Sequence, residues 1–176
     1  MILFVISACI HEPSTAQLAS LTDEHLSVST FFSSDLNLSF SRINSAAGWA
    51  ALNNDANQWI QVTLNEVKVI VKVATQGRGD WDQWVTSYKL QTSYGGSLEF
   101  VLGADGAERV FAGNVDRDSI VEYCLGEIQA STVRLLPQTW YRRISMRWEV
   151  YALEYEGTVE IPYSPGQALT VKFSIS

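Results

Sequence analysis

The chain has few of the residues that usually carry enzyme chemistry. Its 176 residues include two His and two Cys. His11 and His25 both precede the first predicted strand, and neither stands beside a nucleophile in a recognised arrangement. Neither the Gly-x-Ser-x-Gly motif nor a phosphate-binding loop occurs. We therefore expect no enzymatic activity and assign no catalytic residue.

The scarcity of cysteine also limits disulfides and metal sites. Cys9 and Cys124 are too few for a disulfide scaffold, and no Cys-x-x-Cys pair predicts a zinc site. A single bridge between them is chemically possible, but the sequence does not place them within reach. We expect no cofactor and no metal. Calcium is the open alternative, at Asp80 with Asp82 or at Asp55 with Glu149, although no dense acidic loop surrounds either pair.

Positive charge is scarce as well. Twelve Lys and Arg face nineteen Asp and Glu, for a net charge of −7. This balance counts against nucleic acid as a partner, because nonspecific binding needs a basic face. It also weakens attraction to an anionic membrane, which would depend on a local cluster such as Arg142, Arg143 and Arg147.

Long apolar runs are missing, since no segment approaches the roughly 20 apolar residues that span a bilayer. The run at residues 2–8 is short and ends in a small residue. We interpret residues 1–8 as the remnant of a secretory signal, although the positive start of such a signal is lacking. An apolar first segment in an incomplete chain is the equal alternative.

Alternation of apolar and polar residues dominates the rest of the chain. In residues 59–64, Ile60, Val62 and Leu64 share one face, and residues 67–74 are rich in Val and Ile. Similar alternation marks residues 88–92 and 144–150, and turn residues separate these segments. Helix is predicted only at residues 15–21. The pattern favours an antiparallel β-sandwich or jelly roll.

Several short motifs occur in an order typical of one family. They are Asn-Gln-Trp-Ile-Gln-Val-Thr-Leu (57–64), Thr-Gln-Gly-Arg (75–78), Trp-Val-Thr-Ser-Tyr-Lys (84–89), Val-Phe-Ala-Gly-Asn-Val-Asp (110–116), Val-Arg-Leu-Leu-Pro-Gln-Thr-Trp (133–140) and Ile-Ser-Met-Arg-Trp-Glu-Val-Tyr (144–151). Together they resemble the discoidin family, the type C domains of coagulation factors V and VIII. The resemblance implies a jelly-roll sandwich of the galactose-binding-domain type.

The resemblance also suggests the domain organisation. It covers a discoidin domain at residues 9–155. Residues 156–176 then form a β-hairpin tail or the start of a truncated second domain, and we favour the second domain. Members of the family usually join their two ends by a disulfide. Cys9 stands where the first cysteine is expected, but no cysteine occupies the partner position near residues 152–153.

Members of this family bind ligands through loops at one end of the sandwich, here residues 34–40, 44–48 and 78–83. The resemblance therefore implies an extracellular, cell-surface adhesion module that recognises galactose-type carbohydrate. Anionic phospholipid head groups, or an integrin-like receptor bound through Arg78-Gly79-Asp80, are the alternative partners, and a homo-oligomer is left open. The candidate ligand-binding residues are Asp35, Leu36, Leu38, Asn44, Arg78, Gly79, Asp80, Trp81 and Asp82.

Several of these residues also have a structural interpretation. Leu36, Leu38 and Phe40 alternate, so they either point outward for membrane insertion or face the core. Asn37 begins an N-glycosylation sequon, and a glycan there would oppose insertion. Arg78 either reaches a ligand or pairs with a neighbouring carboxylate in a turn that glycine permits. Four tryptophans in strand positions are expected to anchor the core: Trp59, Trp84, Trp140 and Trp148.

Overall fold

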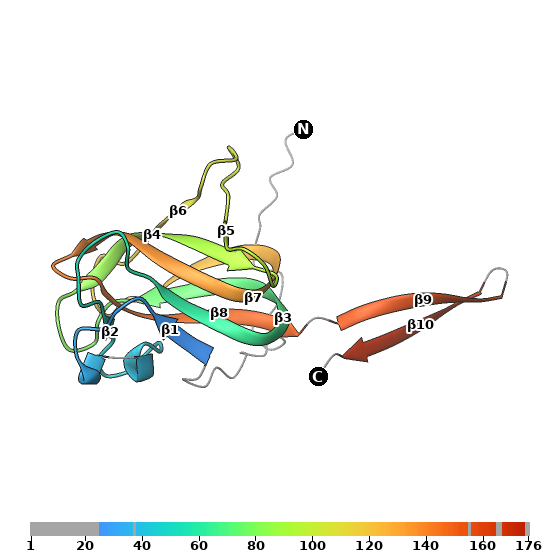
Figure 1. The fold of residues 1–176 in the computed structure, drawn as a ribbon, viewed down its shortest axis with the longest axis horizontal. Helices are drawn as coiled ribbons and strands as arrows, with labels where there is room; N and C mark the ends of the chain where they lie inside the picture. Colours follow the sequence, from blue (N-terminus) through green and yellow to red (C-terminus); the bar gives the residue numbers. More distant parts are fainter. Residues whose placement is uncertain (1–24, 37, 155, 165–166, 175–176) are drawn as a thin grey trace.

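The computed structural model describes residues 25–36, 38–154, 156–164 and 167–174. Figure 1 shows a β-sandwich with a two-stranded sheet beyond one end of it. Two 3-10 turns precede β2 (Trp49–Ala50): η2 (Ser34–Leu36) and η3 (Leu38–Phe40). No helix among these residues is long and apolar enough to cross a membrane. The helix expected at residues 15–21 lies outside the described residues, as do residues 1–8, Cys9, His11 and Asn37.

The predicted all-β antiparallel sandwich is confirmed. Its strands are β1 (Leu26–Val28), β2 (Trp49–Ala50), β3 (Ile60–Gln76), β4 (Trp84–Ser93), β5 (Glu99–Phe100), β6 (Val110–Ala112), β7 (Val121–Tyr141) and β8 (Ser145–Glu154). Hydrogen bonds link them in the order β2-β8-β3-β7-β4-β5, with β1 on β3 and β6 on β4. All these strand pairs are antiparallel.

Strands β3 and β7 each belong to both layers of the sandwich. The first part of β3, residues 60–63, pairs with β1 and with residues 132–135 of β7. After a register shift, residues 68–75 of β3 pair with residues 121–130 of β7, and β8 pairs on the other side. Strand β4 contacts only the later part of β7. One layer therefore contains β1, β4, β5 and β6, and the other contains β2 and β8.

The hydrophobic core fills the space between these layers. Ile60, Val62 and Leu64 are buried, as their alternation predicts, while Gln61 and Thr63 are more exposed. Trp148 is buried as predicted, and Trp49 is fully buried beside it in the same cluster. The other members of that cluster are Leu26, Ala51, Ile70, Val73, Val85, Tyr88, Leu90, Phe111, Ala130, Val133, Leu135, Ile144, Met146, Val150 and Ala152.

Strand β8 departs from the pattern expected of a half-buried strand. Its apolar residues face the core, but the polar residues between them, Ser145, Arg147 and Glu149, are buried as well. Each has a partner from another segment: Ser145 Oγ donates to Trp49 O over 2.8 Å, and Glu149 forms an ion pair with Arg42 at 2.5 Å. Strand β2 supplies Trp49 and the segment before it supplies Arg42, and the sequence alternation carries no information about these partners.

The chain after the sandwich forms an antiparallel pair, β9 (Glu156–Ser164) with β10 (Gln167–Ser174). Figure 1 shows this pair as a separate sheet. The assignment of these residues to a tail or to a second domain stays a prediction. Cys124 is disulfide-bonded, so it is not a free thiol.

A close backbone contact at Gly113 gives a test of the packing beside β6. A Cβ at this position would lie 2.3 Å from Val85 O, whereas a Cβ at Gly96 would meet nothing within 4 Å. We expect Gly113→Ala to lower the free energy of unfolding by about 1–3 kcal/mol, because the backbone must shift to admit the methyl group. Urea unfolding measures the change, with Gly96→Ala as the matched control. Equal stability of the two variants would contradict the packing.

Candidate functional site

The topology gathers the long loops at one end of the sandwich. Strands β3 and β7 each bend in the middle, at the end of the sandwich opposite the loops, where they pass from one layer to the other. Both ends of each strand therefore point toward the loops. Figure 1 shows these loops on the side away from β9 and β10. We call residues 44–48, 77–83 and 113–120 the loop end. It includes two of the three segments predicted to bind ligand.

Main-chain hydrogen bonds fix the loop that joins β3 to β4. Arg78 N donates to Gln83 O over 2.9 Å, and Gln83 N donates to Trp81 O over 2.8 Å. Gly79 N donates to Ala47 O over 2.8 Å, which ties this loop to the one before β2. A Cβ on Gly79 would lie 2.6 Å from Ala46 O, so only glycine allows this approach. The loop is therefore held rigidly at its base.

The Arg-Gly-Asp sequence is folded onto itself. Arg78 is 8% exposed. Its Nε and Nη2 donate to the two carboxylate oxygens of Asp80 at 2.6 and 2.9 Å, and its Nη1 donates to Gln83 Oε1 at 3.1 Å. All three guanidinium nitrogens thus have partners inside the loop. Arg78 therefore pairs with a neighbouring carboxylate, as its structural interpretation predicted, and its guanidinium is directed into the loop.

The exposed surface of the loop end combines an aromatic ring with charged groups. Trp81 is 59% exposed. Asp82 lies beside it in the sequence, and its carboxylate is 4.0 Å from the Arg117 guanidinium of the neighbouring loop. Asn44 is exposed with a positive φ of 65°, and its backbone N donates to Gln76 Oε1 over 3.0 Å. These side chains offer an apolar ring and polar groups of both signs on one rigid support.

The predicted core role of the other tryptophans holds in part. Trp84 is half-buried and stacks on Tyr141, with ring centroids 4.4 Å apart. Trp59 lies on the sheet surface under the guanidinium of Arg134, at 4.2 Å. Trp140 packs against the core from a half-buried position. Trp81 therefore differs from these three in having a largely free ring.

The residues that join the loops were not predicted as site residues. Arg147 donates to carbonyl oxygens in three loops, and Gln76 links the loops at Asn44 and Asp118. Arg147 occupies a polar position of an alternating strand, where a side chain normally faces solvent. The sequence carries no signal that loops cover it.

The suggested basic cluster at Arg142, Arg143 and Arg147 does not form a common surface. Arg147 is buried under the loop end. Arg143 Nη1 donates to Ala51 O and Leu52 O, and Arg142 lies over the ring of Tyr141. Carbonyl groups of neighbouring segments thus take up the side chains of Arg143 and Arg147, and the local cluster on which membrane attraction would depend is not formed.

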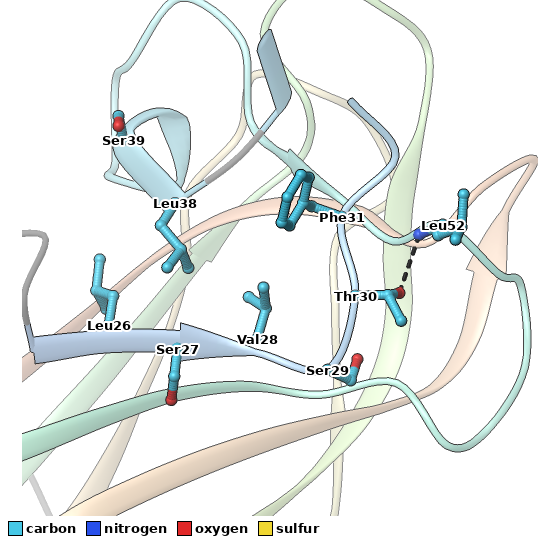
Figure 2. A pocket seen from close by; sticks show the side chains of 9 residues that line it. All are labelled: Leu26, Ser27, Val28, Ser29, Thr30, Phe31, Leu38, Ser39 and Leu52. Atoms are coloured by element: carbon cyan, nitrogen blue, oxygen red, sulfur yellow. Dashed lines mark hydrogen bonds between the residues drawn. The ribbon is translucent and has the colours of Figure 1, made fainter. Parts of the chain in front are cut away.

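A second surface near β1 is apolar and was not identified from the sequence. It is a hollow of about 740 Å³, shown in Figure 2. Phe31, Phe32 and Leu52, which we call the apolar patch, are each half-exposed, and Phe31 and Leu52 line the hollow. The other lining residues are Leu26, Ser27, Val28, Ser29, Thr30, Leu38 and Ser39.

A buried amide fixes the backbone beneath the apolar patch. Gln58 Oε1 accepts hydrogen bonds from Ser29 Oγ at 2.8 Å and Thr30 Oγ1 at 2.5 Å. Thr30 Oγ1 in turn accepts from Leu52 N at 3.1 Å, the bond drawn in Figure 2. Phe32 N donates to Ala50 O over 2.8 Å. The patch is therefore a built surface rather than a loose tip.

Leu36 and Leu38, which were considered for a membrane-inserting tip, do not point outward into solvent. Leu36 is buried, and Leu38 packs against the core while it lines the hollow. Their core-facing alternative describes the structure. The side chain of Asp35 and the whole of Asn37 lie outside the described residues, so the glycosylation site stays a prediction.

The carboxylates suggested for calcium have other partners. Asp55 Oδ1 accepts from Asn57 N and from Gln58 Nε2, both at 2.9 Å, and Glu149 pairs with Arg42. Burial raises the pKa of Glu149, against the opposing effect of Arg42. Across the part of the chain that the structure describes, no three His, Cys, Asp or Glu side chains gather as a metal site would require.

Comparison with known proteins identifies the family. The model of the F5/8 type C domain matches residues 27–150. Mouse retinoschisin is 40% identical over 115 residues, which cover 62% of this chain and 51% of that protein. The chain therefore spans about half the length of this curated relative.

Two solved structures are similar in fold. Recombinant discoidin II of Dictyostelium discoideum superposes with a TM-score of 0.68 and 33% identity, over 77% of this chain and 61% of that one. The family 32 carbohydrate-binding module of C. perfringens NanJ, solved with galactose, gives a TM-score of 0.56 and 16% identity, over 73% of this chain and 95% of that one. The second likeness shows the fold alone.

The chain belongs to the F5/8 type C domain family, as its motifs predicted. It is a binding module of the discoidin type.

The Arg78–Asp80 ion pair inside the β3–β4 loop predicts that the stability of the fold depends on pH in the acid range. Hydrogen bonds from Arg78 lower the pKa of Asp80 below its ordinary value of 3.8. A carboxylate whose pKa is lower in the folded state than in the unfolded state stabilises the fold at any pH above its unfolded-state pKa. This stabilisation is lost as the pH falls through the pKa of the folded state. We expect wild type to lose more stability than Asp80→Asn when the pH is lowered from neutral to below 3.8.

Urea unfolding at each pH measures this difference. Glu149 titrates in both proteins, so its opposite effect cancels. Asp105→Asn, at the β5–β6 turn, is the control and should follow wild type. Parallel pH profiles for wild type and Asp80→Asn would show that the pair contributes nothing.

Proposed function

We propose that this chain is a non-catalytic, extracellular carbohydrate-binding and adhesion module that recognises galactose-type sugars at its loop end. One observation carries the proposal: Trp81 keeps 59% of its surface exposed on a loop whose backbone is fixed at both ends. More than half of this ring stays in water, so folding leaves a large part of its apolar surface free for a ligand. A rigid exposed indole is well suited to a ligand with one apolar face.

Galactose supplies such a face together with hydroxyl groups at its edge. The C–H groups of the sugar would lie on the Trp81 indole. Asp82 would accept hydrogen bonds from hydroxyls and Arg117 would donate to them, and charge-assisted bonds of this kind are the stronger ones. Because the loop is already ordered, little conformational entropy is lost on binding.

The relatives support the same class of ligand. The module from C. perfringens NanJ has the same fold and was solved in complex with galactose. Discoidin II, at 33% identity, is a nearer relative in sequence. We place the protein outside the cell, in contact with cell-surface glycans. Integrin-type adhesion is disfavoured, because Arg78 pairs with Asp80 of the same motif.

A galactose-affinity measurement with Trp81→Ala tests the sugar site. We expect the dissociation constant to rise at least about tenfold, which corresponds to about 1.4 kcal/mol, because the stacking surface is lost. Isothermal titration with galactose and lactose measures the change. Tyr94→Ala is the matched control: Tyr94 is 65% exposed, but it lies at the far end of β4.

The control should bind as wild type does. Unchanged affinity of Trp81→Ala would place any sugar site elsewhere, and a glycan array with no bound glycan would end the proposal.

The apolar patch favours a second candidate function, peripheral binding to phospholipid. Phe31, Phe32 and Leu52 form an exposed apolar surface, and the Arg143 guanidinium lies 4.3 Å from the Phe32 ring centroid. Large exposed side chains beside a cation suit the boundary between acyl chains and head groups. The net charge of −7 opposes this on anionic membranes.

Liposome sedimentation separates the two functions. If the patch binds lipid, replacing both Phe31 and Phe32 by Ser should remove sedimentation with phosphatidylserine vesicles and leave galactose affinity unchanged. Leu102→Ser, an exposed apolar residue on the β5–β6 connection, is the control. Added salt should weaken binding to anionic lipid and hardly affect binding to sugar. Wild type that fails to sediment would exclude the lipid function.

A further inference from the structure

One buried cation joins the three loops of the loop end. The Arg147 residue is 5% exposed. Its Nε donates to Gly77 O over 2.7 Å, its Nη1 to Ser45 O over 2.8 Å and its Nη2 to Arg117 O over 2.7 Å. Each acceptor belongs to a different loop.

A guanidinium is suited to this position by its shape. Its five N–H groups lie in one plane and point in fixed directions, so one side chain reaches three separate carbonyl oxygens. A Lys ammonium is a compact group whose donors do not match this spacing. Without the guanidinium, these carbonyl groups would need water or would remain unpaired, and either outcome loosens the loops.

The surrounding contacts show that the loops are in direct contact around Arg147. Gln76 Nε2 donates to Asp118 O over 2.7 Å, while its Oε1 accepts from Asn44 N over 3.0 Å. A Cβ on Gly77 would lie 2.5 Å from the Cα of Arg117. Two side chains from strand ends therefore bond to the main chain of all three loops, and the loops meet without a gap.

The position of Trp81 depends on this arrangement because the main-chain bonds that hold its loop are part of it. The loop is closed by Arg78 N to Gln83 O, and it is fixed to its surroundings by Gly79 N to Ala47 O and by Arg147 to Gly77 O. Gly79 is bonded to the loop that Arg147 also holds, through Ser45 O. Arg147 thus determines the position of the Trp81 loop by two routes.

We propose that Arg147 is a positioning residue for the ligand site: it holds the Trp81 loop in its binding conformation and touches no ligand. The inference rests on the proposed function for the identity of the ligand. The claim that Arg147 orders the Trp81 loop rests on the hydrogen bonds alone and does not depend on the ligand.

The Arg147→Lys variant tests the proposal with the charge kept. If only about a tenth of the molecules keep the competent loop, the apparent dissociation constant for galactose rises about tenfold. The free variant should also show faster motion of the Trp81 indole, measured by relaxation of its assigned indole N–H resonance. Galactose at saturating concentration should restore the wild-type relaxation, because binding selects the ordered loop.

Arg134→Lys is the matched control, because Arg134 also makes a hydrogen bond and a ring contact but lies on the face of the sheet. It should keep both the galactose affinity and the Trp81 mobility of wild type. A merely structural role for Arg147 would lower thermal stability without changing Trp81 mobility in the folded state, and that result would overturn the proposal. Folded Arg147→Lys with wild-type mobility and affinity would also overturn it.

Gln76→Met provides a second variant if Arg147→Lys does not fold. It removes the bonds to Asn44 and Asp118 and buries no charge. Like Arg147→Lys, it should increase the mobility of Trp81. If Trp81 in this variant is no more mobile than in wild type, these bonds do not position the loop. If wild type binds no glycan while Arg147→Lys frees the Trp81 loop, the proposed function fails and the positioning role stands.

Discussion

The layer change of β3 and β7 is the constraint on which the rest of the structure depends. Both strands pair with each other in one layer, shift register, and pair again in the other layer. Because each strand turns back at the same end, all four of their termini lie at the opposite end, where the long connections must form. The loops are thus brought together by strand pairing and not by attraction between their side chains.

Gathering the loops leaves many main-chain groups without strand partners, and buried side chains supply the bonds. Arg147 and Gln76 bond to the main chain of the loop end, and Gln58 does the same beneath the apolar patch. Each of these three residues is buried and polar. A buried polar group is costly unless it is satisfied, so the loops and the residues beneath them stabilise each other.

The fold was predictable from the sequence, while the site was predictable only in part. The alternation at Ile60, Val62 and Leu64 reports a two-sided strand directly, and the order of the motifs identifies the family. Trp81 could be named because a large aromatic residue in a glycine-rich loop has no strand to pack in. Arg147 could not be recognised, because its burial comes from segments about 30, 70 and 102 residues away in the chain. The apolar patch was missed for a related reason: Phe31 and Phe32 sit in no periodic pattern, and Gln58, which fixes the backbone just before them, is distant in the sequence.

The contacts of Arg147 are all made to carbonyl oxygens, and this has a consequence for variation among related domains. Every residue has a carbonyl group, so the side chains of the three loops can be exchanged without losing these bonds. Gly77, Gly79 and Gly113 are restricted, by the close approach of neighbouring main chain. The scaffold thus separates the residues that give the loops their shape from those proposed to meet the ligand. New recognition surfaces can be grafted at Trp81, Asp82 and Arg117 on an unchanged framework.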